Sequence, residues 1–212
     1  YTLRADEMFL NRMIGGTFEG SNDPDFREKE VLYLINEKPK RLQTVVQSYS
    51  SKSYRYVRYI GPKDSHCNIA EAAFYTPNDT ASLKGKVIGT PGCFQKDGSH
   101  EYTNVFDGDV TTSFDYIESS GGWSGLDLGT PKQIGKIVYT PRNYDNYVCH
   151  GDDYELFYCS QDKWKSLGKQ TSYADSLVYK NVPINVLLLL KNHDRGIQER
   201  IFTYQERSQV WK

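Results

Sequence analysis

The sequence KQIGKIVY at residues 132–139 alternates around Ile134, Lys136 and Val138, the period of two that puts every second side chain on one face of a β-strand. Runs rich in β-branched, leucine or aromatic residues follow as YELFY, INVLLLLK and IQERIFTY (residues 154–158, 184–191 and 197–204). Turn-forming clusters separate these runs. Short strands at this spacing, without helices between them, predict an all-β, antiparallel β-sandwich.

Helical signals are scarce along the rest of the chain. The one amphipathic candidate covers residues 4–13, and it is short and lacks a capping residue. The composition includes 17 tyrosines and 9 phenylalanines but only 2 methionines, a mixture that suits pleated, half-buried strands better than packed helices.

The charge balance limits the classes of partner. Lys and Arg number 26 against 27 Asp and Glu, whereas proteins that bind nucleic acid or anionic membranes normally carry a basic excess. The longest apolar run, Val186–Leu190, is far shorter than a membrane-spanning helix, which needs about 18 residues or more. We therefore expect a monomer without a nucleic-acid partner and without a transmembrane segment.

The four cysteines give no metal-binding pattern. Cys67, Cys93, Cys149 and Cys159 form no CxxC pair and have no His/Cys spacing typical of zinc sites, so a structural zinc ion is not expected. Either Cys149 pairs with Cys159 across neighbouring strands or all four thiols are free. Their number leaves both alternatives open.

An internal repeat determines the predicted domain organisation. Four landmarks recur in the same order with different loop lengths: residues 1–4 with 139–142, 18–23 with 157–162, 32–35 with 164–167, and 68–74 with 196–202. Residues 1–77 match only the second half of the segment that follows. We therefore predict a partial sandwich at residues 1–77 and a complete sandwich at residues 78–212. Because half a sandwich leaves its sheet edges uncovered, its missing strands must come from upstream sequence or from packing against the second copy.

A set of ordered motifs carries a family resemblance. NVFDGDVTTSF at residues 104–114 is followed by GWSGLDLG at residues 122–129, a strand ending in Arg142, and a last strand with IQE at residues 197–199. Together they resemble the discoidin-like, or coagulation-factor type C, domains, a group that includes family 32 carbohydrate-binding modules. The resemblance covers residues 84–206 and implies a jelly-roll, galactose-binding-like sandwich. Phe114 stands where the family usually has Trp.

The turn Asp107-Gly108-Asp109 with Thr112 brings two carboxylates and a hydroxyl together. Such oxygen-rich clusters suit Ca²⁺, although the spacing is not that of an EF-hand and the alternative is a hairpin turn without a metal. The resemblance implies a structural Ca²⁺ ion, and it names as ligands Asp107, Asp109, Thr112 and Glu199 with the backbone oxygens of Asn104 and Gln198. In residues 1–77 only Glu71 corresponds to one of them.

The resemblance also implies a ligand-binding face on the loops at one end of the sandwich. Arg142 keeps the position of an arginine that contacts sugars, and His150 stands where the family has Asn. Aromatic and polar side chains on these loops suit a carbohydrate. The other candidates are Tyr144, Tyr147, Tyr116 and His193. Alternatively, Arg142 is a salt-bridge partner at a strand end, the two loop tyrosines pack locally, and His150 is an ordinary surface residue. Trp123 and Trp164 are assigned to the core.

The sequence contains no GxSxG, HExxH or glycine-rich phosphate loop, so we expect no enzymatic activity in this stretch. A catalytic domain upstream in the parent protein stays open. The expected function is a non-catalytic carbohydrate-binding or adhesion module of a larger secreted, cell-surface or periplasmic protein of bacterial type. The alternative is a structural or protein-interaction module that spaces or docks neighbouring domains. Phospholipid binding ranks last, because the loops carry tyrosines rather than exposed apolar spikes.

Overall fold

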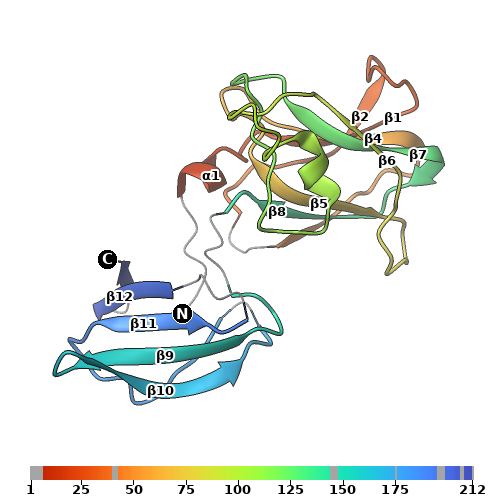
Figure 1. Cartoon of the computed structure of the whole chain (residues 1–212). Helices are drawn as coiled ribbons and strands as arrows, with labels where there is room; N and C mark the ends of the chain where they lie inside the picture. Colours follow the sequence, from red (N-terminus) through yellow and green to blue (C-terminus); the bar gives the residue numbers. More distant parts are fainter. Residues whose placement is uncertain are drawn as a thin grey trace. The chain divides into compact units, whose positions relative to one another are not determined.

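The structure is a computed structural model that describes residues 7–39, 43–143, 148–174, 176–194, 199–205 and 208–211. The described residues form two compact units, which lie within residues 5–144 and residues 145–212 (Figure 1). Nearly all regular structure is antiparallel β-sheet, which confirms the predicted fold class. None of the described helices has the length and hydropathy needed to span a bilayer.

Two antiparallel sheets build the unit at residues 5–144. The larger sheet has the strand order β2-β1-β4-β7-β6, with bounds Lys29–Leu34, Thr17–Ser21, Ser53–Ile60, Trp123–Gln133 and Lys86–Gly89. The smaller sheet has the order β3-β8-β5, with bounds Thr44–Gln47, Lys136–Pro141 and Ile69–Tyr75. The short helix α1 (Glu7–Asn11) and the 3₁₀ helix η1 (Tyr102–Phe106) lie outside the sheets.

Aromatic side chains from both sheets meet in the core of this sandwich. Phe18 of the larger sheet lies at its centre, with ring-centroid distances of 5.1 Å to Tyr59, 5.3 Å to Tyr139 and 6.0 Å to Phe74. All four side chains are buried. Phe114 is also completely buried. The alternating pattern of the strands therefore closes a single core between the two sheets.

The sequence-based boundary after residue 77 falls inside this sandwich. Strand β4 pairs along its length with β7, and the two lie side by side in Figure 1. Strand β8 pairs with β3 on one side and β5 on the other. Segments from both sides of residue 77 thus share both sheets, because each leaves edges that only the other covers. The structure divides the chain near residue 144 instead.

The unit at residues 145–212 contains one described sheet rather than a complete sandwich. Its strand order is β10-β9-β11-β12-β13, with bounds Lys163–Thr171, Asp153–Ser160, Leu188–Asn192, Glu199–Gln205 and Ser208–Trp211. Tyr154, Leu156, Leu188, Leu190 and Phe202 form most of its buried cluster.

Several local predictions need correction. The strand predicted over residues 132–139 is interrupted, because β7 ends at Gln133 and β8 begins at Lys136. Gly135 lies between them, where a Cβ atom would lie 2.7 Å from Pro77. The strand predicted from residue 184 starts only at Leu188. Trp164 is 41% exposed on edge strand β10 and is not a core residue. Of the two alternatives that the sequence left open for the cysteines, the structure shows the one without a disulfide bond.

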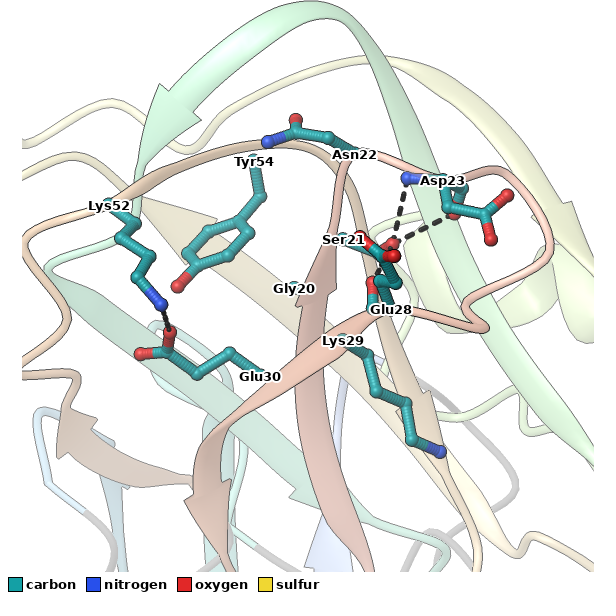
Figure 2. A pocket seen from close by; sticks show the side chains of 9 residues that line it. All are labelled: Gly20, Ser21, Asn22, Asp23, Glu28, Lys29, Glu30, Lys52 and Tyr54. Carbon is teal, nitrogen blue, oxygen red and sulfur yellow. Dashed lines mark hydrogen bonds and ion pairs between the residues drawn. The ribbon is translucent and has the colours of Figure 1, made fainter.

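Two ends of the sandwich carry loops that matter below. The register of β1, β4 and β7 places Ser21 and Ser53 at one end and Ile60 and Trp123 at the other. A polar cleft lies at the first end, beside the β1–β2 hairpin (Figure 2). We call the second end, with the loops at residues 61–68 and 113–122 and the residues that follow β8, the loop end.

Candidate functional site

The predicted metal turn follows η1 and is held by its own side chains. The Asp107 carboxylate accepts hydrogen bonds from the backbone N–H of Asp109 at 2.7 Å and from the Thr112 hydroxyl at 2.8 Å. Gly108 at the tip has a φ of +85°, the left-handed region that favours glycine. The Asp109 carboxylate instead accepts from the backbone N–H and the hydroxyl of Thr111, at 2.9 Å and 2.6 Å.

Glu71 is the carboxylate from a distant segment that reaches this turn. It lies on β5, and its Oε1 atom accepts a hydrogen bond from the backbone N–H of Gly108 at 2.9 Å. Burial and a hydrogen bond with the Asp107 carboxylate raise the pKa of Glu71 to about 8, although the Gly108 N–H opposes the shift. The Glu71 carboxyl is therefore protonated at neutral pH, next to the Asp107 carboxylate.

A divalent cation fits the chemistry of the Glu71–Asp107 pair. A cation between the two carboxylates would lower their repulsion, as the proton on Glu71 does at neutral pH. Hard cations bind carboxylate, hydroxyl and carbonyl oxygens. Among the described residues, however, no three His, Cys, Asp or Glu side chains converge on one point. The site consequently offers two carboxylates and the Thr112 hydroxyl, and backbone oxygens or water would have to complete the coordination shell.

The structure describes the remaining predicted metal ligands only in part, and the backbone oxygen of Asn104 accepts the Asp107 N–H at 3.5 Å. Glu199 belongs to the unit at residues 145–212, and its side chain and all of Gln198 lie outside the described residues. The amide of Asn104 donates to the carbonyl oxygens of Ser99 at 2.9 Å and Ser113 at 3.3 Å, so it ties η1 to the loops around it. Glu71 is the described glutamate that contacts this turn. The repeat had marked these two glutamates as equivalent.

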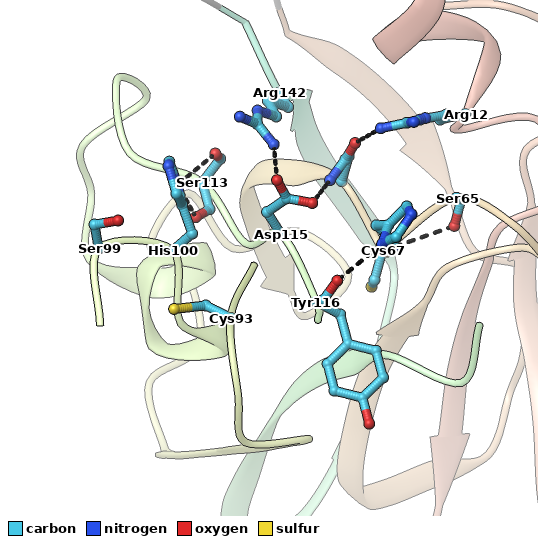
Figure 3. Close-up of polar contacts among 12 residues, drawn as sticks. Arg12, Ser65, Cys67, Cys93, Ser99, His100, Ser113, Asp115, Tyr116 and Arg142 are labelled. Atoms are coloured by element: carbon cyan, nitrogen blue, oxygen red, sulfur yellow. Dashed lines mark hydrogen bonds and ion pairs between the residues drawn. The ribbon is translucent and has the colours of Figure 1, made fainter. Parts of the chain in front are cut away.

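A chain of polar contacts crosses the loop end (Figure 3). The Arg12 Nη1 atom donates to Asn68 Oδ1 at 2.7 Å, and Asn68 Nδ2 donates to Asp115 Oδ1 at 2.7 Å. The other oxygen of Asp115 accepts from Arg142 Nη1 in an ion pair. These four side chains come from the segment after α1, the loop before β5, the loop after η1 and the end of β8. We call them the loop-end cluster.

Arg142 is held firmly inside this cluster. Its side chain is 11% exposed and that of Asp115 is 9% exposed. Its guanidinium carbon lies 4.7 Å from the centre of the Phe9 ring, so the cation also packs on an aromatic face. The structure thus places Arg142 in the salt bridge that the sequence left open as an alternative.

Tyr116 lies beside the loop-end cluster but points away from it. Its backbone N–H donates to the His66 carbonyl oxygen at 2.7 Å, and its own carbonyl oxygen is 3.0 Å from His66 Nδ1. The half-buried ring packs on Phe114 with a centroid distance of 6.0 Å, and its hydroxyl is directed away from the Asp115 carboxylate (Figure 3). Its contacts stabilise the loop.

The other predicted ligand residues do not join Arg142 in the described unit. His150 is exposed and His193 forms an ion pair with Glu155 at 2.8 Å, and both belong to the unit at residues 145–212. Tyr144 and Tyr147 lie outside the described residues. Of the predicted ligand residues, the sandwich therefore carries Arg142 and Tyr116.

Three members of the loop-end cluster were not predicted as site residues from the sequence. Asp115 directly follows the motif that ends at Phe114, and Asn68 directly precedes β5, so each is adjacent to a sequence pattern that could have drawn attention to it. Arg12 had none, because nothing local connects it to Asn68, which is 56 residues away.

Cys67, drawn near the cluster in Figure 3, is a packing residue. It is completely enclosed, and burial raises the pKa of its thiol to about 12, so the thiol stays protonated at neutral pH.

Comparisons of the chain with models of protein families, with curated proteins and with solved structures find no match.

Proposed function

We propose that this chain is a non-catalytic carbohydrate-binding module of a larger secreted or surface-exposed protein, and that its sandwich contacts a glycan through the loop end. One observation carries the proposal: the loop-end cluster gathers a guanidinium, an amide, a carboxylate and a second guanidinium from four separate segments. Sugar hydroxyls require hydrogen-bonding groups in fixed directions. The mutual bonds of the cluster fix those directions before a ligand arrives, which lowers the entropic cost of binding.

Arg12 is the member that we expect to contact the ligand most directly. It is half-buried, and it is bound to Asn68 through Nη1 while its guanidinium carbon lies 5.9 Å from the centre of the Phe9 ring. Asn68, which is 1% exposed, and the enclosed pair of Arg142 and Asp115 would orient Arg12 from beneath.

We also propose that a Ca²⁺ ion between Glu71 and Asp107 stabilises the same sandwich. The proximity of the half-buried Glu71 carboxyl to the Asp107 carboxylate supports this proposal, because a cation between them would remove their mutual repulsion. The ion would fix the turn that joins η1 to β5. It would have no part in contacting the glycan.

The glycan proposal is tested with the full chain on a glycan array, followed by isothermal titration with the best ligand. We expect Arg12→Ala to weaken binding at least tenfold, equivalent to about 1.4 kcal/mol. Arg55→Ala is the matched control, because Arg55 pairs with Asp127 at 2.8 Å on the larger sheet, away from the loop end. No bound glycan, or equal losses in both variants, would contradict the proposal.

The burial of the Arg142–Asp115 pair favours a second candidate, a module that docks neighbouring domains without binding sugar. A cluster that is largely satisfied within the protein has fewer groups left for a ligand. This candidate predicts an empty glycan array together with a measurable affinity for adjacent domains of the parent protein.

A further inference from the structure

The cleft at the end of the sandwich remote from the loop end has no part in the proposed function. It has a volume of about 420 Å³, within the range of roughly 300–1,000 Å³ that is usual for small-molecule sites. The β1–β2 hairpin forms one side of it, and Lys52 and Tyr54 at the start of β4 form another (Figure 2).

The floor of the cleft is the aromatic ring of Tyr54, which packs on the backbone of Gly20. Tyr54 is 4% exposed, and a Cβ atom on Gly20 would lie only 2.6 Å from its ring, so the ring lies flat on the glycine. The Tyr54 hydroxyl is 2.7 Å from the Ser50 hydroxyl. Because one face of the ring is covered in this way, the floor is rigid but offers little surface for stacking.

The walls carry charges of both signs. Lys52 Nζ lies 2.8 Å from Glu30 Oε2, and the two side chains are 73% and 35% exposed. The hydrogen bond from Lys52, assisted by Ser50 and Tyr54, lowers the pKa of Glu30 to about 2, so the pair is ionised at neutral pH. On the hairpin side the cleft is lined by Glu28 and by Lys29, which pairs with Glu19 at 3.0 Å.

Because charges of both signs line the cleft, they favour a neutral ligand over a charged one. An anion would meet the carboxylates of Asp23, Glu28 and Glu30. A cation would meet the ammonium group of Lys52, whereas the ammonium group of Lys29 is directed away from the Lys52–Glu30 pair and contacts Glu19 (Figure 2). A hydroxyl group both donates and accepts hydrogen bonds, so vicinal hydroxyls can bridge a carboxylate and an ammonium group without breaking their ion pair. We propose that this cleft is a second binding site that takes a neutral, hydroxyl-rich ligand of the size of one pyranose residue.

Binding should be weak because the cleft offers little exposed aromatic surface on which a sugar ring could stack. We expect dissociation constants on the order of millimolar, which suits a site that adds to the binding of a multivalent glycan. The inference goes beyond the loop-end proposal and does not depend on it, because no residue of the cleft belongs to the loop-end cluster.

The test is a ¹⁵N-edited NMR titration of the full chain with methyl glycosides of galactose, glucose and mannose, each up to about 50 mM. At least one glycoside should shift the amide signals of Gly20, Lys29 and Glu30 in a saturable manner. Lys52→Met should abolish these shifts, and Lys180→Met, an exposed lysine in the other unit, should leave them unchanged. Signals elsewhere in the spectrum report that Lys52→Met is folded.

Three results would overturn the inference. One is the absence of cleft shifts with all three glycosides. The second is persistence of the shifts in Lys52→Met. The third is stronger binding of glucuronate or glucosamine than of the neutral glycosides. Arg12→Ala separates the two sites, because it should leave the cleft shifts intact whatever its effect on glycan binding at the loop end.

Discussion

Replacing Glu71 by glutamine should change how the stability of the sandwich depends on pH. Glutamine keeps the oxygen that accepts the Gly108 N–H at 2.9 Å but removes the group whose pKa is raised from 4.5 to about 8. A raised pKa means that the folded state favours the protonated carboxyl. The stabilisation is therefore fully present below the unfolded-state pKa of 4.5, and it is lost as the pH rises through the folded-state value of about 8.

The size of the effect follows from the shift. One pKa unit corresponds to about 1.4 kcal/mol, so the wild-type protein should lose about 3 kcal/mol of unfolding free energy between about pH 5 and pH 8. All other ionisable groups are common to both proteins. The difference between wild type and Glu71→Gln isolates the carboxyl, and the variant should lose about 3 kcal/mol less.

Urea denaturation in the presence of EDTA measures this difference. The chain has 3 tryptophans, and the background changes Trp164→Phe and Trp211→Phe leave Trp123 on β7 as a fluorescence reporter of the sandwich alone. Calcium should reverse the loss at high pH in the wild type, by about 2.7 kcal/mol at a hundredfold excess over its dissociation constant, and should not do so in Glu71→Gln. Equal pH slopes in the two proteins would refute the pairing of Glu71 with Asp107.

Two further substitutions test the packing of the larger sheet. Arg58→Met should cost about 3 kcal/mol in urea denaturation, because it removes the buried partner that the Glu19 carboxylate contacts at 2.7 Å and leaves the more exposed Lys29 to compensate that charge. The exposed Arg55→Met should cost about 1 kcal/mol or less, and equal costs would show that burial of the pair is unimportant. Gly20→Ala should destabilise the sandwich by about 1–3 kcal/mol, because its Cβ would lie 2.6 Å from the Tyr54 ring. Unchanged stability of Gly20→Ala would mean that the ring moves freely.

The fold class could be predicted because it depends on short-range patterns. Alternation along strands such as β8 and β9, separated by turn residues, is visible in the sequence. The pairing of β4 with β7 is not visible, because a strand's own residues do not specify which distant strand completes its hydrogen bonds. The boundary after residue 77 failed for this reason. Trp164 was misplaced similarly, since the sequence does not tell which strands form the exposed edge of a sheet.

The candidate sites were predictable where a motif was compact. The Asp107 turn and Arg142 were both found, because residue type and spacing single them out. The choice between Glu71 and Glu199 required the tertiary structure, because the repeat makes the two glutamates equivalent. Asp115 and Asn68 carry no signature of their own, and their importance follows only from the hydrogen bond of 2.7 Å that joins them.

The position of β8 between β3 and β5 has a consequence for the order in which the protein can fold as it is synthesised. On the ribosome, β3 and β5 emerge long before β8, and they have no partner in their own sheet until residues 136–141 are available. Strand β4 likewise has one open flank until residues 123–133 appear. Contacts between such distant segments make folding slow, so a nascent chain of this protein would expose unpaired, aromatic-rich strands until β7 and β8 have been synthesised.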